Sequence, residues 1–276
     1  MNHPLRARIY WARRFVQTPL TFRNWPQVMR DMALGRRGRG PEKLTFLTRS
    51  GLRIETPNVP GARVPVYEIF AEDCYRLDWL LGPLLDRPIQ VVDIGGHVGT
   101  FACRLTQLHP KASVVSCEPS AATAASLRRN AELNGVSDRV TVFQQAVAAT
   151  TGRAVFHDNG GGSGLNGLAA VGHASGPSTE VETIAFDEVI AATPQPVDVI
   201  KIDCEGAEYD LVLGSTPSSW ESVQRVVIEF HPVEGHGWPE LHEFFAGVGL
   251  IEQDKVSWEG YGCVWLSREP LPPFKS

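Results

Sequence analysis

The stretch VVDIGGHVGTF at residues 91–101 decides the fold, because a β-branched run passes there into glycines and then into a helical pattern. Glycines at a strand-to-helix turn let the backbone approach a ligand closely. Their spacing is not the G-x-G-x-x-G of dinucleotide-binding proteins, which disfavours a nicotinamide-dependent oxidoreductase. Asp93 precedes the glycines, and a carboxylate there attracts a cation and repels a pyrophosphate.

Apolar strand-like runs alternate with helical segments on the carboxyl-terminal side of this stretch. An alternation of β and α predicts an α/β fold, a Rossmann-like, doubly wound and mostly parallel sheet with helices on both faces. Such sheets bind ligands at the carboxyl ends of their strands. The expected strands are residues 89–94, 113–117, 140–143, 197–203, 225–230, 250–253 and 262–266, and the expected helices are residues 100–108, 121–133, a segment from 207, and 240–246.

A second carboxylate, Glu118, ends the next strand along the chain. An acid at that position can accept both hydroxyl groups of a ribose. The expected ligand therefore has a ribose and positive charge but no phosphate, and S-adenosylmethionine has this chemistry. The alternative is a tight turn between strand and helix, in which Asp93 is a helix cap.

Length and composition agree with an ordinary globular protein. A chain of 276 residues and 30.3 kDa allows one large α/β domain or two small ones. No apolar run approaches the roughly 18 residues of a membrane span. The five cysteines include no C-x-x-C pair, which argues against a disulfide scaffold or a zinc ribbon. A reducing, cytoplasmic location is the expectation.

Charge is distributed unevenly along the chain. Residues 1–53 contain twelve Lys and Arg but only two acids, whereas the whole chain has a net charge of −5. We therefore expect a basic N-terminal extension over residues 1–75 and a catalytic domain over residues 76–276. The basic segment either contacts an anionic surface or partner or is a solvated extension. Nucleic acid is not the expected partner, because the rest of the chain is acidic.

Two shorter readings complete the organisation of the chain. Within the basic segment we expect helices at residues 9–17 and 25–34 and a pair of strands at 44–48 and 52–55. The glycines at residues 160–164 predict a loop.

Several segments resemble the FkbM-type methyltransferases, a branch of the S-adenosylmethionine-dependent superfamily. The most specific is IKIDCEGAE at residues 200–208, and the others are VDIGGHVG at 92–99, CEP at 117–119, LNG at 133–135 and AV at 146–147. The resemblance implies a seven-stranded sheet, S-adenosylmethionine as cofactor, and methyl transfer to hydroxyls of sugars or polyketide products. His97 departs from the family pattern, which usually has Asn or a small residue there.

The cofactor-binding residues expected from these observations are gathered at the ends of the strands and just before the first of them. The resemblance implies that Tyr75 closes over the cofactor, with a core aromatic on a helix as the alternative. Gln145 would reach the adenine edge, with an exposed loop side chain as the alternative. The full set is Tyr75, Asp93, Gly95, Gly96, His97, Gly99, Thr100, Phe101, Glu118, Pro119, Gln145, Ala146 and Asp203.

The expected catalytic residues are Asp203, His231 and His157. Asp203 can hold the sulfonium end or accept a hydroxyl proton. The pKa of an imidazole suits a general base near neutral pH, which favours His231. Lys201 lies two residues before Asp203 and is the expected counter-charge, and Glu208 is expected only to sit favourably at a helix N-terminus.

No metal is assigned, although a divalent ion held by Asp203, Glu229 and His231 is a minority alternative. The expected function is an S-adenosylmethionine-dependent O-methyltransferase acting on a small hydroxylated acceptor. The rival from another class is a non-catalytic cofactor-binding protein that docks a partner through the basic segment.

Overall fold

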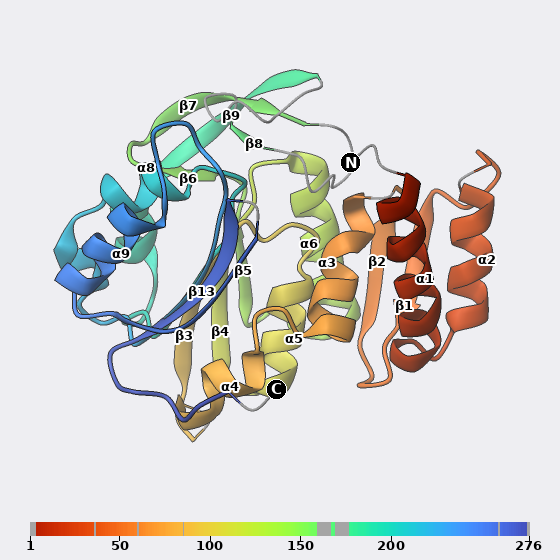
Figure 1. Ribbon diagram of the computed structural model, residues 1–276, viewed down its shortest axis with the longest axis horizontal. Coiled ribbons are helices and arrows are strands. Elements are labelled where there is room, and N and C mark those ends of the chain that lie inside the picture. The colour runs from red at the N-terminus through yellow and green to blue at the C-terminus, as the bar shows by residue number, and fades with distance from the viewer. Residues whose placement is uncertain are drawn as a thin grey trace.

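The computed structural model describes residues 4–35, 37–59, 61–84, 86–158, 167–168, 177–258 and 260–274. Its central element is a seven-stranded sheet in the order β12-β13-β11-β10-β3-β4-β5 (Figure 1). Five neighbouring strands run parallel, while β13 pairs antiparallel with β11 and β12 with β13. The predicted mostly parallel, seven-stranded α/β sheet is confirmed. Its strands are β3 (Ile89–Ile94), β4 (Ala112–Cys117), β5 (Val140–Phe143), β10 (Val199–Ile202), β11 (Arg225–Phe230), β12 (Ile251–Trp258) and β13 (Tyr261–Ser267).

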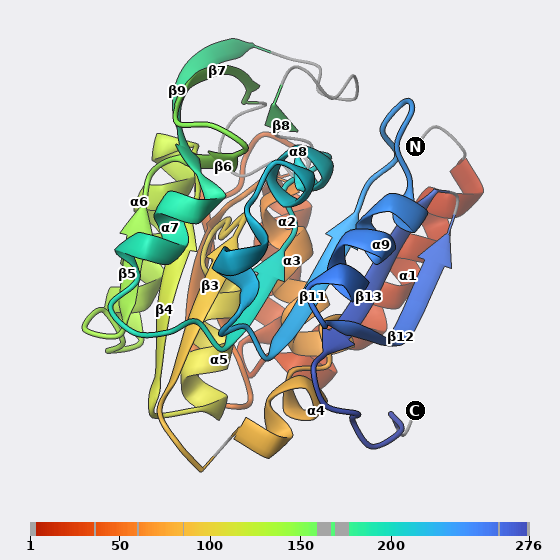
Figure 2. The same cartoon turned by 90° about the vertical axis from the view of Figure 1, so that its left-hand side faces the viewer.

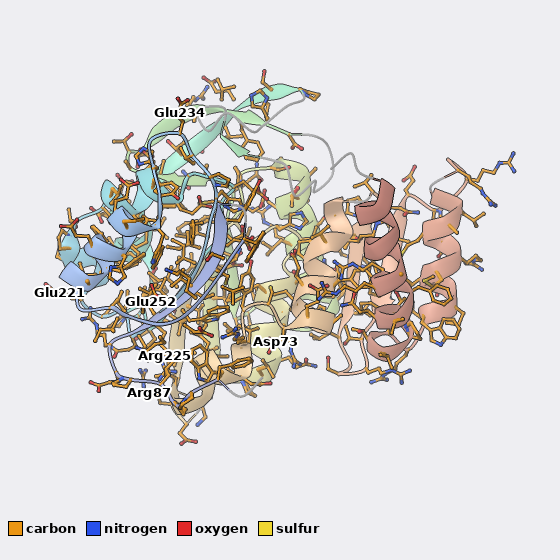
Figure 3. All side chains as sticks on the ribbon, in the orientation of Figure 1. Asp73, Arg87, Glu221, Arg225, Glu234 and Glu252 are labelled. Carbon is orange, nitrogen blue, oxygen red and sulfur yellow. The ribbon has the colours of Figure 1, made fainter. Side chains whose placement is uncertain are left out.

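Helices cover both faces of this sheet, as a doubly wound fold requires (Figure 2). Along β3, Val91 joins the hydrophobic cluster on one face, while Val92 and Ile94 join the cluster on the other. Side chains fill the space between the layers (Figure 3). The labels in that figure place Arg87, before β3, and Glu234, after β11, at opposite ends of the strands. One face carries α4 (Leu77–Leu81), α5 (Thr100–Leu108) and α6 (Ala121–Leu133), and the other carries α7 (Phe186–Ala192), α8 (Glu208–Leu213) and α9 (Trp238–Gly247).

A smaller four-stranded sheet lies above the carboxyl ends of the large one (Figures 1 and 2). The sequence did not predict it, because most side chains of its two longest strands are exposed or half-buried, which removes the apolar signal of a strand. The predicted loop at residues 160–164 lies outside the described residues. The strands are β6 (Ala146–Ala148), β7 (Gly152–His157), β8 (Gly167–Leu168) and β9 (Ser178–Ala185).

The N-terminal segment forms the helices and the strand pair that its sequence predicts. Figure 1 shows α1 and α2 at one end of the molecule with β1 and β2 beside them. The side chains of Phe46 and Tyr67 are fully buried in the same hydrophobic cluster as Leu105 and Trp265. The segment is therefore packed against the helices on one side of the sheet rather than extended as a free arm, and the boundary at residue 75 stays a prediction. Its elements are α1 (Pro4–Thr21), α2 (Trp25–Gly35), β1 (Lys43–Leu47), β2 (Arg53–Pro57) and α3 (Val64–Tyr67).

Asn130 on α6 ties this segment to the glycine-rich turn. Its side chain is fully buried, and its Oδ1 accepts a hydrogen bond from the backbone N–H of Glu55 at 2.8 Å. Its Nδ2 donates to the carbonyl of Glu55 at 2.9 Å and to that of Val98 at 2.8 Å. Removing this amide would leave buried backbone groups without partners, so β2 and the turn depend on the same side chain.

No helix among the described residues combines the length and the apolar character that crossing a membrane requires.

Phe46→Ala should lower the free energy of unfolding of the whole chain by about 3–5 kcal/mol, because it empties a fully buried site. Phe15→Ala is the control: that ring on α1 is 66 % exposed, and its loss should change stability by no more than about 0.5 kcal/mol. Denaturation followed by circular dichroism and tryptophan fluorescence measures both. A Phe46→Ala protein whose main transition stays in place, with a second transition moved, would show that the segment folds separately.

Candidate functional site

The turn after β3 packs so closely that glycine is required at two positions. A Cβ on Gly95 would lie 1.8 Å from the carbonyl oxygen of Asp203, and Gly95 also has φ +80°. A Cβ on Gly96 would lie 2.0 Å from Oγ of Ser116. The N–H groups of both glycines donate to the carbonyl of Cys117, at 3.0 and 2.9 Å. The turn is therefore fixed against the ends of both neighbouring strands, β4 and β10.

A buried ammonium lies beneath this turn. Lys201 on β10 donates to the carbonyls of Ile94 at 3.2 Å and Gly95 at 2.6 Å. Its Nζ lies 3.4 Å from Oδ1 of Asp93 and 3.6 Å from Oδ2 of Asp203. The predicted counter-charge to Asp203 is confirmed. The cation that Asp93 contacts is this lysine, and because Asp93 is fully buried, its predicted contact with a cofactor stays a prediction.

Tyr75 meets Asp203 at the end of β10. Its hydroxyl donates to Oδ2 of Asp203 at 2.7 Å, and its ring packs edge-on against Phe101 with centroids 5.8 Å apart. The residues two before and one after it, Asp73 and Arg76, both have positive φ, at 46° and 50°. Such conformations persist in non-glycine residues where the surroundings over-determine them. The sequence alternative of a helical core aromatic is wrong in part, because Tyr75 is buried but lies in a turn.

Glu118 follows β4 and is held by two backbone N–H groups. Its Oε2 accepts from His97 at 3.0 Å and its Oε1 from Ser120 at 2.9 Å. Burial raises its pKa to about 7, although these hydrogen bonds and the charge of Lys201 lower it. Each carboxylate oxygen has a second lone pair, so both can accept a further hydrogen bond.

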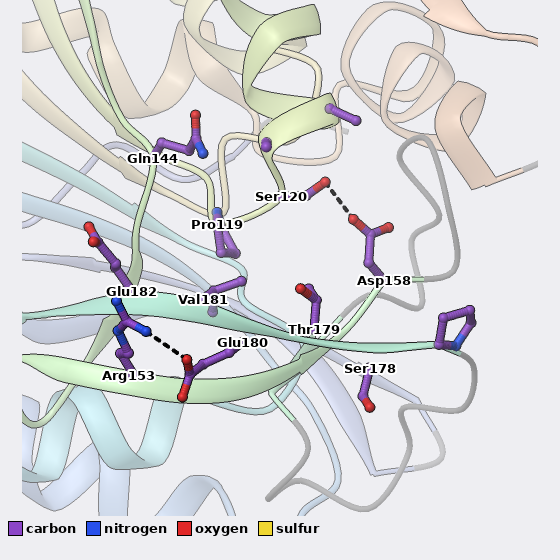
Figure 4. Close-up of a pocket in the computed structure, with 13 residues that line it drawn as sticks. Pro119, Ser120, Gln144, Arg153, Asp158, Ser178, Thr179, Glu180, Val181 and Glu182 are labelled. Carbon is purple, nitrogen blue, oxygen red and sulfur yellow. Dashed lines mark hydrogen bonds and ion pairs between the residues drawn. The ribbon is translucent and has the colours of Figure 1, made fainter.

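A cavity of about 750 Å³ opens beside Glu118, between the N-terminus of α6 and strands β7 and β9 (Figure 4). Pro119 and Gln144 line it, whereas the predicted Gln145 does not. The predicted contact of Gln145 with an adenine stays a prediction. Ala146 is buried in β6, beyond the cavity.

The structure brings Asp203 and His231 together, as predicted, and adds two glutamates. Ligand atoms of Asp203, Glu205 and His231 all lie within 4.8 Å of one another. Nδ1 of His231 lies 2.9 Å from Oε1 of Glu208, and its Nε2 lies 3.5 Å from Oε2 of Glu205. The interpretation of Glu208 as a mere helix-end charge is therefore incomplete: it is fully buried, accepts from the N–H groups of Cys204 and Gly206, and orients His231.

The protonation of this cluster differs from the expectation. Burial lowers the pKa of His231, but the hydrogen bond and charge of Glu208, followed by the charges of Glu205 and Asp203, raise it to about 10. Burial also raises the pKa of Glu205 to about 8 and that of Glu229 to about 9. An imidazolium cannot accept a proton, so the raised pKa argues against a His231 base that titrates near neutral pH. The part of His231 in catalysis stays a prediction.

His157 lies in a different place from the other two predicted catalytic residues. It ends β7, and the next residue, Asp158, accepts a hydrogen bond from Oγ of Ser120 at 2.7 Å (Figure 4). This contact places that end of β7 beside the N-terminus of α6, whereas Asp203 and His231 follow β10 and β11. Neither Glu205 nor Glu208 was predicted to take part in the site, although both lie in the segment that carried the resemblance.

The fold is a doubly wound α/β sheet, and the glycine turn after β3 and the acids after β4 and β10 lie at the carboxyl ends of its strands, where sheets of this class bind ligands. Residues 93–248, more than half of the chain, match the methyltransferase FkbM domain family, so the chain belongs to that family. It is a methyltransferase.

Curated relatives agree with this assignment. "Methyltransferase 1" of Beauveria bassiana is 26 % identical over 64 % of this chain and 78 % of its own length. The "2-O-methyltransferase NoeI" of Sinorhizobium fredii is 31 % identical over 48 % of this chain, and the match spans 59 % of its length. Among solved structures, the "SAM Dependent Methyltransferase from Agrobacterium tumefaciens" is 10 % identical with a TM-score of 0.48, covering 83 % of this chain and 71 % of that one.

Lys201→Met should destabilise the fold by about 3–5 kcal/mol, because it leaves the buried charge of Asp93 without its partner. Adding Asp93→Asn removes that charge, so the double variant should be more stable than Lys201→Met alone. Urea denaturation of the four proteins in the cycle measures the coupling. Additive effects of the two substitutions would show that the pair does not stabilise the turn.

Proposed function

We propose that the chain is an S-adenosylmethionine-dependent O-methyltransferase whose acceptor is a hydroxyl of a sugar or a polyketide-like natural product. One observation carries the proposal: β3, β4 and β10 end at a single edge and bring the glycine turn, Glu118 and Asp203 together. The family match and the 2-O-methyltransferase among the relatives support it.

The residues at this edge fit the chemistry of that cofactor. The turn leaves no room for a side chain at Gly95 or Gly96, where a Cβ would meet Asp203 or Ser116. Glu118 offers its carboxylate oxygens to the two hydroxyl groups of a ribose, and the cavity beside it has room for an adenine ring. The N–H groups at the start of α5, at Thr100 and Phe101, favour a carboxylate. Bound there, S-adenosylmethionine supplies a methyl group attached to a sulfonium.

Asp203 is the residue that we assign to the acceptor hydroxyl. Burial raises the pKa of Asp203, but the charges of Lys201 and His231 and the hydrogen bond from Tyr75 lower it overall, so the carboxylate stays ionised. Asp203 would accept the proton of the acceptor hydroxyl, whose oxygen would take the methyl group that the sulfonium supplies. Alignment of the reacting atoms supplies on the order of 7–11 kcal/mol of the barrier reduction.

Glu118→Gln should weaken S-adenosylmethionine binding by about 10- to 100-fold, because hydrogen bonds to a charged acceptor contribute about 1.5–3 kcal/mol. Isothermal titration calorimetry measures the affinity. Glu132→Gln, on the exposed side of α6, is the matched control and should bind like wild type. Equal affinity in all three proteins would remove Glu118 from the cofactor site.

The same carboxylate should make cofactor binding depend on pH. The pKa of Glu118 is about 7, and its ionised form accepts hydroxyl donors better, so affinity should rise between pH 6 and pH 8 by about tenfold. Asp93 on β3, Lys201 on β10 and the N–H groups of His97 and Ser120 surround it, and all remain in the Glu118→Gln variant. That variant should therefore show a flat profile, and an equal slope in both proteins would contradict the assignment.

Asp203→Asn should lower turnover by about 10²–10⁴-fold, the usual contribution of a positioned proton acceptor. Formation of S-adenosylhomocysteine is measured with a panel of glycosides and polyketide alcohols. Glu221→Gln, an exposed acid before the start of β11 and so at the opposite strand ends from Asp203, should retain wild-type turnover. If no hydroxylated acceptor is methylated while amines or thiols are, the O-specificity is wrong.

A further inference from the structure

We propose that Asp203, Glu205 and His231 form a binding site for one divalent cation of the Mg²⁺ and Mn²⁺ type. Each residue offers one ligand atom, and the three atoms lie within 4.8 Å of one another. Two of the residues follow β10 and the third follows the neighbouring strand β11, so the parallel sheet itself sets their spacing. Two carboxylate oxygens and one imidazole nitrogen are a donor set found in sites for such ions.

The orientation of His231 points independently to a ligand. The residue is 7 % exposed, and its Nδ1 is taken by the buried carboxylate of Glu208. Its Nε2 makes no hydrogen bond among the residues that the structure describes, and it faces Oε2 of Glu205 at 3.5 Å. A ring nitrogen bonded to a carboxylate, with the other nitrogen directed at further ligands, is the usual arrangement of a metal-binding histidine.

The two carboxylates leave room for more ligands. The side chains of Asp203 and Glu205 are 26 % and 34 % exposed, so water or an acceptor oxygen can reach a bound ion. Oδ2 of Asp203 is fixed by the hydroxyl of Tyr75, which orients the carboxylate without neutralising it. Mg²⁺ keeps several waters and is often bound by only one or two carboxylates, which suits a half-open site.

Charge around the three residues also favours a cation. Glu208 and Glu229 lie close enough to act on Glu205 or His231, and Glu68 acts on Glu205. Lys201 is the lysine that neutralises part of this charge, 3.6 Å from Asp203, and it is shared with Asp93. A divalent ion would balance the remaining negative charge.

This inference rests on the proposed function only for the part the ion would play, which is to hold an acceptor oxygen beside Asp203. Binding of the ion does not depend on that part. The two proposals can therefore fail separately.

The test uses Mn²⁺ as the probe on the full chain, after treatment with a chelator. Electron paramagnetic resonance and calorimetry should show one Mn²⁺ per chain, and Glu205→Gln and His231→Asn should each weaken it at least tenfold. The matched control is His236→Asn. His236 is an exposed histidine whose Nδ1 lies 2.9 Å from Glu240, the same histidine–glutamate contact without the neighbouring acids. It should leave Mn²⁺ affinity unchanged.

Absence of Mn²⁺ binding, or equal affinity in wild type and both site variants, would overturn the proposal. Glu205 is partly exposed, so its variant should keep the wild-type unfolding midpoint and stay informative if the His231 variant does not fold. Full methyl transfer in excess chelator together with no Mn²⁺ binding would refute the ion and leave the methyltransferase. Site-specific Mn²⁺ binding without any methyl transfer would support the ion and refute the proposed function.

Discussion

A single buried ammonium, that of Lys201, joins the parts on which the site depends. It contacts the carbonyls of Ile94 and Gly95 at the end of β3, the carboxylate of Asp93 within that strand, and the carboxylate of Asp203 after β10. Burying a charge is costly unless opposite charges and hydrogen bonds compensate, so these groups must fold together. The lysine thereby fixes the distance between the glycine turn and the acid assigned to the acceptor.

The N-terminal segment supports this centre from the other side. Asn130 binds β2 and the carbonyl of Val98 with one amide, so the position of the turn depends on residues far earlier in the chain. The segment's basic character therefore describes its surface, while its apolar residues belong to the same core as α5. The charge of residues 1–53 suggests a separate extension, but the apolar residues of the segment pack in the same core as α5.

Around Asp203 the chain concentrates negative charge in a half-open site, where Asp203 and Glu205 are partly exposed. The carboxylate of Glu208 accepts hydrogen bonds from two backbone N–H groups and also contacts Nδ1 of His231. The contact with His231 sets the direction in which the imidazole faces. The same bond changes the chemistry of the histidine, because a carboxylate in contact holds a proton on the ring. A histidine at a strand end is a candidate base by its sequence, but neighbouring carboxylates in the fold raise its pKa and favour the protonated ring.

The sequence by itself determined the seven-stranded sheet, the glycine turn, and the positions of Glu118 and Asp203 at strand ends. Alternating apolar patterns and glycines after a strand are local signals. Tertiary structure alone decided that Lys201 is the cation of Asp93 and that Tyr75 bonds to Asp203. It also decided that Gln144, not Gln145, lines the cavity and that Glu208 holds His231. These contacts join residues on different strands and turns, and their protonation depends on burial. The distance between separate segments and the burial of their side chains cannot be predicted from the local sequence pattern.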